Sequence, residues 1–286
     1  MSEVTTDERA IEGVASGVPF LAIPPEHAAS PDSATVVAWH LLDPPRTPAG
    51  FAAALPLAGL DAWRVYLGLP MSGSRKPAGG DEELLRLGYE DGVLNIQGPI
   101  TDQAAREFGP AYAEIAGQLG LAPGPVGLLG GSAGAAVALL VLAEQDVDIA
   151  AAVLVSPLVR LRSLVEAMDR HFGVEYSWSD RSREVATRLD FVERASEIAE
   201  RRQDPAVLLV VGEDDDIDGI RRPAEELRDA LADRYAKPAL AGLELIPGMG
   251  HQLADPPGDD PAPQTPSAAE VDRLAVDWFR RHLRSD

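Results

Sequence analysis

A serine between small residues follows an apolar run near the middle of the chain. Residues 126–137 read Val-Gly-Leu-Leu-Gly-Gly-Ser-Ala-Gly-Ala-Ala-Val, which places Gly-x-Ser-x-Gly around Ser132. This pattern is typical of a sharp strand-to-helix turn from which the serine hydroxyl projects. Gly130 and Gly134 allow the two backbones to approach closely. The N–H of Ala133, at the helix N-terminus, would then face an oxyanion. The segment predicts a nucleophilic serine.

Two other glycine-rich motifs fit the segment less well. A phosphate-binding P-loop requires Gly-Lys-Ser/Thr, and no lysine is present here. A dinucleotide-binding turn requires Gly-x-Gly-x-x-Gly and an acidic residue ending the next strand. The glycines here stand at 127, 130, 131 and 134, and the next apolar run, 149–155, is followed by Ser-Pro. A nicotinamide-dependent oxidoreductase is therefore disfavoured.

An acid and a histidine follow two later apolar runs. Gly212-Glu-Asp-Asp215 comes after residues 206–211, and Pro247-Gly-Met-Gly-His251 comes after residues 243–246. The carboxyl ends of parallel strands meet at one edge of a sheet, so both side chains are expected near Ser132. A neutral histidine can take the serine proton, and a carboxylate can hold its tautomer. The acidic run around Asp215 is also compatible with a solvated loop.

The elements that must position these residues alternate between strands and helices. Such alternation predicts an α/β protein with a mostly parallel sheet covered by helices on both faces. The region 13–24 predicts a short antiparallel start. Predicted strands cover 34–40, 63–69, 126–131, 149–155, 206–211 and 243–246, and predicted helices cover 50–60, 105–119, 220–231 and a last helix opened by a capping box from Ser267 to Glu270.

From about residue 13 to the end, the chain resembles the α/β-hydrolase superfamily. Ser132, Asp215 and His251 occur in that superfamily's chain order, and their loops are similar to its G-x-x-D and G-x-G-H loops. The esterase-like and prolyl-oligopeptidase-like branches are the most similar, although the chain has no room for a propeller. The resemblance implies one α/β-hydrolase domain over 1–286. It also implies a cofactor-independent serine hydrolase that cleaves a carboxylic ester or related acyl substrate through an acyl-enzyme.

Other functions remain open for the same fold. A thioesterase or an acyltransferase would use the same three residues, and the sequence does not separate these enzymes from an esterase. A non-catalytic ligand-binding protein is a further alternative. The presence of all three residues argues against it.

The strand at 34–40 ends in His40-Leu41-Leu42, where the superfamily usually has His-Gly. The resemblance implies that the main-chain N–H of Leu42, or else that of Leu41, joins Ala133 in an oxyanion hole. We expect a structural role for His40. His171 and His282 are expected on the surface or in packing contacts, and His27 in a loop.

The segment 157–203 lies where the superfamily inserts a lid. It is charged and helical, with aromatic residues at Phe172, Tyr176 and Trp178. These aromatics would either shape an apolar acyl or alcohol pocket or pack as ordinary core residues. The glycine-rich segment 70–99 stays unassigned apart from helical character near 82–87.

Composition and charge narrow the class of protein. The chain has 286 residues, a net charge of −21 and no cysteine. This charge disfavours nucleic acids and anionic membranes as partners. The acidic N-terminus lacks signal-peptide features, and no apolar run reaches membrane-spanning length, so we expect a cytoplasmic protein. No spaced metal-ligand motif occurs. The expected partner is a small-molecule acyl substrate.

Overall fold

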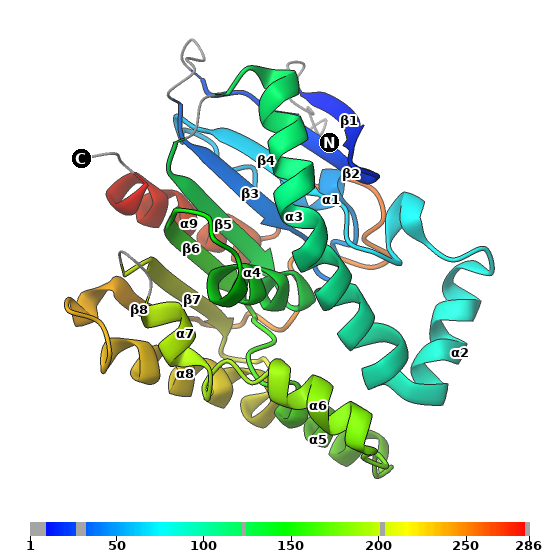
Figure 1. Cartoon of the computed structure of the whole chain (residues 1–286). Coiled ribbons are helices and arrows are strands. Elements are labelled where there is room, and N and C mark those ends of the chain that lie inside the picture. Colours follow the sequence, from blue (N-terminus) through cyan, green and yellow to red (C-terminus); the bar gives the residue numbers. More distant parts are fainter. Residues whose placement is uncertain (1–9, 27–32, 122–123, 201–203, 284–286) are drawn as a thin grey trace.

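An eight-stranded sheet forms the centre of the computed structural model, which describes residues 10–26, 33–121, 124–200 and 204–283 (Figure 1). The strand order is β1-β2-β4-β3-β5-β6-β7-β8. β1 pairs antiparallel with β2, β2 pairs antiparallel with β4, and all other pairs are parallel. The predicted mostly parallel sheet is confirmed. The strands are Ile11–Ala15 (β1), Val18–Ile23 (β2), Thr35–Trp39 (β3), Trp63–Leu67 (β4), Val126–Gly131 (β5), Ile149–Val155 (β6), Ala206–Gly212 (β7) and Ala241–Ile246 (β8).

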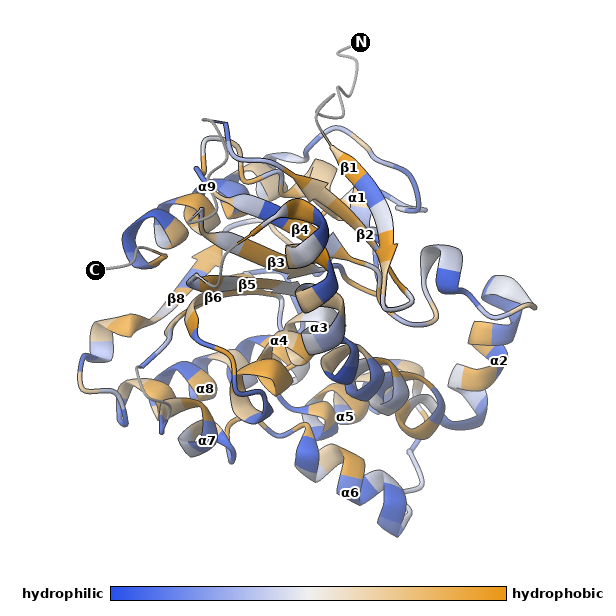
Figure 2. Ribbon diagram, turned by 45° about the horizontal axis from the view of Figure 1, so that its top comes forward, coloured by the Kyte–Doolittle hydropathy of each residue, from blue (hydrophilic) through white to orange (hydrophobic). Residues whose placement is uncertain are grey.

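Helices cover both faces of this sheet, as its apolar strands require. Every residue of β5 and β7 is buried, and so is every residue of β6 except the half-buried Ala150. Strands without a polar face must be covered on both sides. Figure 2 shows the matching pattern, with apolar strands inside and helices that alternate polar and apolar residues around them.

Two hydrophobic cores result, one on each face of the sheet. One core contains residues of α3, α4, α7 and α8, and the other contains residues of α1 and α9. In Figure 1, α3 and α4 lie in front of the sheet and α9 behind it. The helices are Pro48–Ala54 (α1), Gly98–Leu119 (α3), Ala133–Glu144 (α4), Ala195–Ala199 (α7), Arg222–Ala232 (α8) and Pro266–His282 (α9).

Several predicted helix bounds were wrong, including the start of α3, which lies at Gly98 and not at residue 105. The helix predicted at 50–60 spans Pro48–Ala54, because Thr47 caps it by accepting the Gly50 N–H and proline suits the first helical position. The last helix begins at Pro266. Its cap is Thr265, which accepts the Ala268 N–H, and not the predicted capping box at Ser267.

Within the described part of the segment 157–203, three helices have different surroundings. They are α5 (Leu161–Phe172), α6 (Asp180–Arg188) and α7. α7 packs against α4 and α8 and therefore covers the sheet. α6 packs against a π-helical turn, η2 (Val93–Gln97), and α5 against a second one, η3 (Ile217–Arg221). A cap over the strand ends would therefore consist of α5 and α6.

The segment left unassigned at 70–99 contains helix α2 (Gly80–Gly92), which projects from the body of the molecule (Figure 1). No residue of α2 is buried. The helix is separated from η2 at Asp91, whose backbone is not helical. The Asp91 carboxylate accepts the N–H groups of Val93 and Leu94 and the hydroxyl of Tyr176. These bonds fix the angle at which α2 leaves the body.

Candidate active site

Ser132 lies in a strained turn between β5 and α4. Its φ of 48° and ψ of −114° are rarely adopted by residues other than glycine. Such a conformation costs on the order of 1–3 kcal/mol and requires support from its surroundings. The Ser132 N–H donates to Val155 O at 2.9 Å, and Ser132 O accepts the N–H groups of Ala135, Ala136 and Leu158. These bonds hold the turn on both sides.

The glycines that flank Ser132 are required by the close approach of neighbouring backbones. A Cβ atom on Gly130 would lie 2.4 Å from Gly134 O. A Cβ atom on Gly134 would lie 2.3 Å from Trp39 O. Both distances are far inside van der Waals contact. Only glycine therefore lets α4 begin this close to β3 and β5.

Ser132, His251 and Asp215 form a continuous hydrogen-bonded chain, although 119 residues separate the serine from the histidine. His251 Nε2 lies 2.9 Å from Ser132 Oγ. His251 Nδ1 lies 3.0 Å from Asp215 Oδ2 and 3.1 Å from Asp215 Oδ1. Asp215 is 7% exposed, and Ser132 is 8% exposed. The structure thus brings together the three residues singled out from the sequence.

The acidic run after β7 divides into residues with separate contacts. Asp215 contacts His251 and also accepts the Asp216 N–H at 2.8 Å. Asp216 caps η3 by accepting the Gly219 N–H, and Asp218 pairs with Arg170 and Arg222. Of the acids in this run, Asp215 is the one that contacts His251.

The loops that carry Asp215 and His251 are bonded to each other. The Asp214 N–H donates to Met249 O at 2.9 Å, and the Glu213 N–H donates to Ile246 O at 3.0 Å. A Cβ atom on Gly212 would lie 2.0 Å from Met249 O, so only glycine permits this approach. The separation between acid and histidine is therefore set by backbone contacts.

Asp43 also lies close to His251, a contact that the sequence did not reveal. Its Oδ2 is 3.9 Å from His251 Nε2, the nitrogen that faces Ser132. Burial opposes the charged imidazole, but the hydrogen bond and charge of Asp215, together with the charge of Asp43, outweigh it. The pKa of His251 is consequently above its ordinary value. The imidazolium form is stabilised at this position.

His40 is buried and supports the loop that follows β3. Burial lowers its pKa to about 4, so the ring is neutral near pH 7. Its Nε2 accepts the Leu69 N–H at 3.1 Å, which leaves Nδ1–H to donate to Leu41 O at 2.6 Å. These contacts are those of a structural residue, as expected from the sequence.

The three residues expected to supply oxyanion-hole N–H groups have different surroundings. Ala133 is the first residue of α4, so its N–H has no acceptor within the helix. Leu41 is fully buried, and its side chain packs against Gly131. Leu42 is partly buried, and its N–H donates to no main-chain carbonyl within the described ranges.

The aromatic residues Phe172, Tyr176 and Trp178 of the segment 157–203 do not line either of two cavities in the protein. Phe172 is 67% exposed, whereas Tyr176 and Trp178 pack edge to face with centroids 4.8 Å apart. His171 is exposed, and His282 packs against Trp278. His27 lies outside the described residues.

The first cavity lies between α3, α4 and α6, and the second lies between α5 and α8. Neither includes Ser132, Asp215 or His251. In the described part of the chain, no three His, Asp or Glu side chains cluster as a metal site would require. Among the same residues, no helix is long and apolar enough to cross a membrane.

Comparisons with known proteins identify the fold. No protein-family model matches the chain, and no curated protein matches it. Among solved structures, the Thermus thermophilus protein TT1662 is 19% identical, with a TM-score of 0.64 over 97% of this chain and 99% of its own. The esterase Est2 of Thermogutta terrifontis is 17% identical, with a TM-score of 0.61 over 98% and 93%. The chain has the α/β-hydrolase fold.

Larger α/β-hydrolase proteins match over part of their length. A puromycin-hydrolysing peptidase of Mycobacterium tuberculosis is 17% identical, with a TM-score of 0.61 over 96% of this chain. This chain covers only 40% of that peptidase. In all these comparisons the similarity concerns the fold.

Proposed function

We propose that this protein is a serine hydrolase that cleaves a carboxylic ester or a related acyl substrate, with Ser132 as nucleophile, His251 as general base and Asp215 as the acid that orients it. The observation that carries the proposal is the Ser132–His251–Asp215 chain, with distances of 2.9 and 3.0 Å. A serine on a strained turn, a buried carboxylate and a histidine between them are the groups that acyl transfer requires.

The proposed reaction has two halves. His251 Nε2 takes the Ser132 proton as Oγ attacks the carbonyl carbon, and the resulting imidazolium is stabilised by Asp215. The oxyanion receives hydrogen bonds from the N–H of Ala133 and that of Leu42 or Leu41. His251 then protonates the departing alcohol, which leaves an ester of Ser132. Water, deprotonated by His251, releases the carboxylic acid and regenerates the serine.

An ester is favoured as the substrate by the comparisons. The Thermogutta terrifontis esterase matches over nearly its whole length, whereas the peptidase matches over less than half of its chain. The match to the esterase is therefore the more complete of the two, which supports testing esters first. Thioesters and other acyl donors use the same chemistry and belong in the first substrate panel.

The intact mass of the protein after reaction with a fluorophosphonate tests the proposal. The wild type should gain one adduct, because such probes react with activated serines. Ser132→Ala should gain none and should lose ester turnover by at least about a thousandfold. Ser156→Ala is the matched control, since Ser156 also follows a strand with a positive φ, but its hydroxyl forms no hydrogen bond in the described part of the chain. Labelling of Ser132→Ala at the wild-type rate would refute the assignment.

A further inference from the structure

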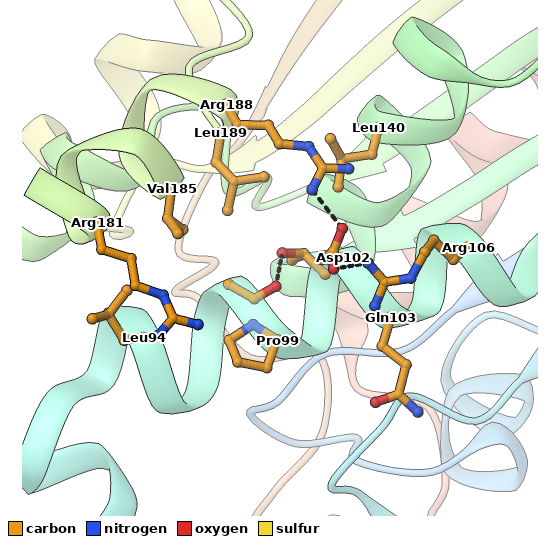
Figure 3. A pocket seen from close by; sticks show the side chains of 12 residues that line it. Leu94, Pro99, Asp102, Gln103, Arg106, Leu140, Arg181, Val185, Arg188 and Leu189 are labelled. Carbon is orange, nitrogen blue, oxygen red and sulfur yellow. Dashed lines mark hydrogen bonds and ion pairs between the residues drawn. The ribbon is translucent and has the colours of Figure 1, made fainter.

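A cavity of about 300 Å³ lies between α3, α4 and α6 (Figure 3). Its apolar wall is formed by Leu94, Pro99, Leu140, Val185 and Leu189. Leu140 lies eight residues beyond Ser132 along α4, which is about 12 Å at the rise of an α-helix. No residue of the candidate active site lines this cavity, so it is a separate place on the molecule.

The charges that line the cavity are opposite to those of the whole protein. Arg106, Arg181 and Arg188 face a single acid, Asp102, which leaves a formal charge of +2. The chain as a whole carries −21. Asp102 pairs with both Arg106 and Arg188 (Figure 3). Arg188 also pairs with Glu144, which does not line the cavity. A cationic, partly apolar recess on an acidic protein attracts small anions.

Arg181 provides a guanidinium that is not already paired. It extends from α6 toward Leu94 and Pro99 in Figure 3. It forms no ion pair or hydrogen bond with any residue in the described part of the chain. The neighbouring Arg183 on the same helix instead pairs with Asp180 and does not line the cavity. Arg181 is therefore the residue whose donors are available to a ligand.

We propose that this cavity binds a small amphipathic carboxylate, with its head on Arg181 and its tail on the apolar wall. A guanidinium presents two parallel N–H donors, which match the two oxygens of a carboxylate. The volume is at the lower end of the range for ligand sites, which limits the tail to a medium-length chain. The proposal concerns a site beyond the proposed active site and does not depend on hydrolysis.

The position of the cavity gives binding a structural consequence. Arg181 and Val185 belong to α6, whereas Pro99 belongs to α3. A bound carboxylate would contact both helices and hold α6 against the body of the protein. Because a ligand that binds only the folded state stabilises it, the melting temperature should rise with ligand concentration.

Titration of the whole protein with octanoate tests the proposal, with binding followed by calorimetry and by the melting temperature. We expect saturable binding to the wild type and to Arg183→Gln. Binding to Arg181→Gln should be about tenfold weaker, which corresponds to one lost charge-assisted contact. Arg181→Lys should recover part of the affinity. Octylamine, which has the same tail and a positive head, should not bind.

Equal octanoate binding to Arg181→Gln and the wild type would overturn the proposal, and so would binding of octylamine as strong as that of octanoate. Arg181 is exposed, so neither Arg181→Gln nor Arg181→Lys is expected to affect folding. If octanoate bound at the proposed active site instead, its affinity would not change on substitution of Arg181. The outcome is therefore independent of whether Ser132 reacts with a fluorophosphonate.

Discussion

At the scale of single residues, His251 has unequal surroundings on its two ring nitrogens. Nδ1 faces Asp215, which is almost completely buried, whereas Nε2 faces Ser132 and the half-exposed Asp43. Asp215 fixes the ring, as the acid of such a chain must. Asp43 lies on the side where proton transfer would take place. It can therefore change the basicity of His251 without supporting its orientation.

Replacement of Asp43 by Asn should shift the pH dependence of ester hydrolysis. His251 must be neutral to accept the Ser132 proton, so kcat/KM rises as the pH passes the pKa of His251. That pKa is above its ordinary value, partly because of the charge of Asp43. Removing this charge should lower the pKa and move the acid limb of the kcat/KM profile down by about half a pH unit, as expected for a partly exposed pair.

Asp214→Asn is the control for this measurement. It removes a charge from the loop that carries Asp215, but Asp214 is not among the groups that raise the pKa of His251. An unchanged acid limb in Asp43→Asn, or an equal shift in both variants, would contradict the role given to Asp43.

The residues of the candidate site differ in how far the sequence reveals them. Ser132, Asp215 and His251 each follow an apolar strand within a glycine-marked loop, so their type and position could be predicted together. Asp43 could not be predicted, because its only signal is a contact that forms when the loop after β3 reaches the loop after β8. Within the acidic run, Asp215 could be selected from its G-x-x-D loop, whereas the separate contacts of Asp216 and Asp218 are visible only in the structure.

At the scale of elements, the site depends on a few close approaches between backbones. α4 begins against the end of β3, and the loop after β7 lies against the loop after β8. The strands were predictable because each is an apolar run bounded by turn residues. The boundaries of α1 and α9 could not be predicted in the same way. Thr47 and Thr265 are the N-caps, although neighbouring residues have a similar capping propensity.

Two glycine-to-alanine substitutions in helices should have opposite effects on stability. Gly134→Ala would place Cβ 2.3 Å from Trp39 O, and neither backbone can move without disrupting the sheet. We expect it to lower the free energy of unfolding by at least about 3 kcal/mol or to prevent folding. Gly117→Ala in α3 meets no atom within 4 Å and should raise stability by about 0.5–1 kcal/mol.

Urea denaturation of both variants measures these free energies. Comparison with Gly117→Ala separates the effect of the close contact at Gly134 from the ordinary effect of adding a methyl group to a helix. If the Gly134→Ala protein were as stable as the wild type, the close approach of Gly134 to Trp39 O would not be required for folding.

At the scale of the whole molecule, the dominant property is the excess of acidic residues. The net charge is −21 on 286 residues, so the excess carboxylates repel one another in the folded state. Many surface arginines pair with acids along the same helix, but each exposed pair contributes at most about 1 kcal/mol. General repulsion is therefore expected to outweigh the local pairs.

The melting temperature should consequently rise with salt at neutral pH. Between low salt and roughly 0.5 M NaCl, we expect an increase of about 2–5 °C, because salt screens the repulsion over a Debye length. The same titration near pH 4.5, the isoelectric point of the sequence, should show little or no increase. A melting temperature that falls with salt at neutral pH would show that the ion pairs dominate instead.

Helix α2 also provides a means of observing movement in this protein. Tyr89 on this helix is 90% exposed, and the chain contains no cysteine. Tyr89→Cys would therefore create a single thiol, at the end of a helix that contributes nothing to either core. A fluorophore attached there would report on the joint at Asp91, where Tyr176 from the segment after α5 meets the base of α2. The projecting helix makes the protein suited to site-specific labelling without removal of any native residue from its core.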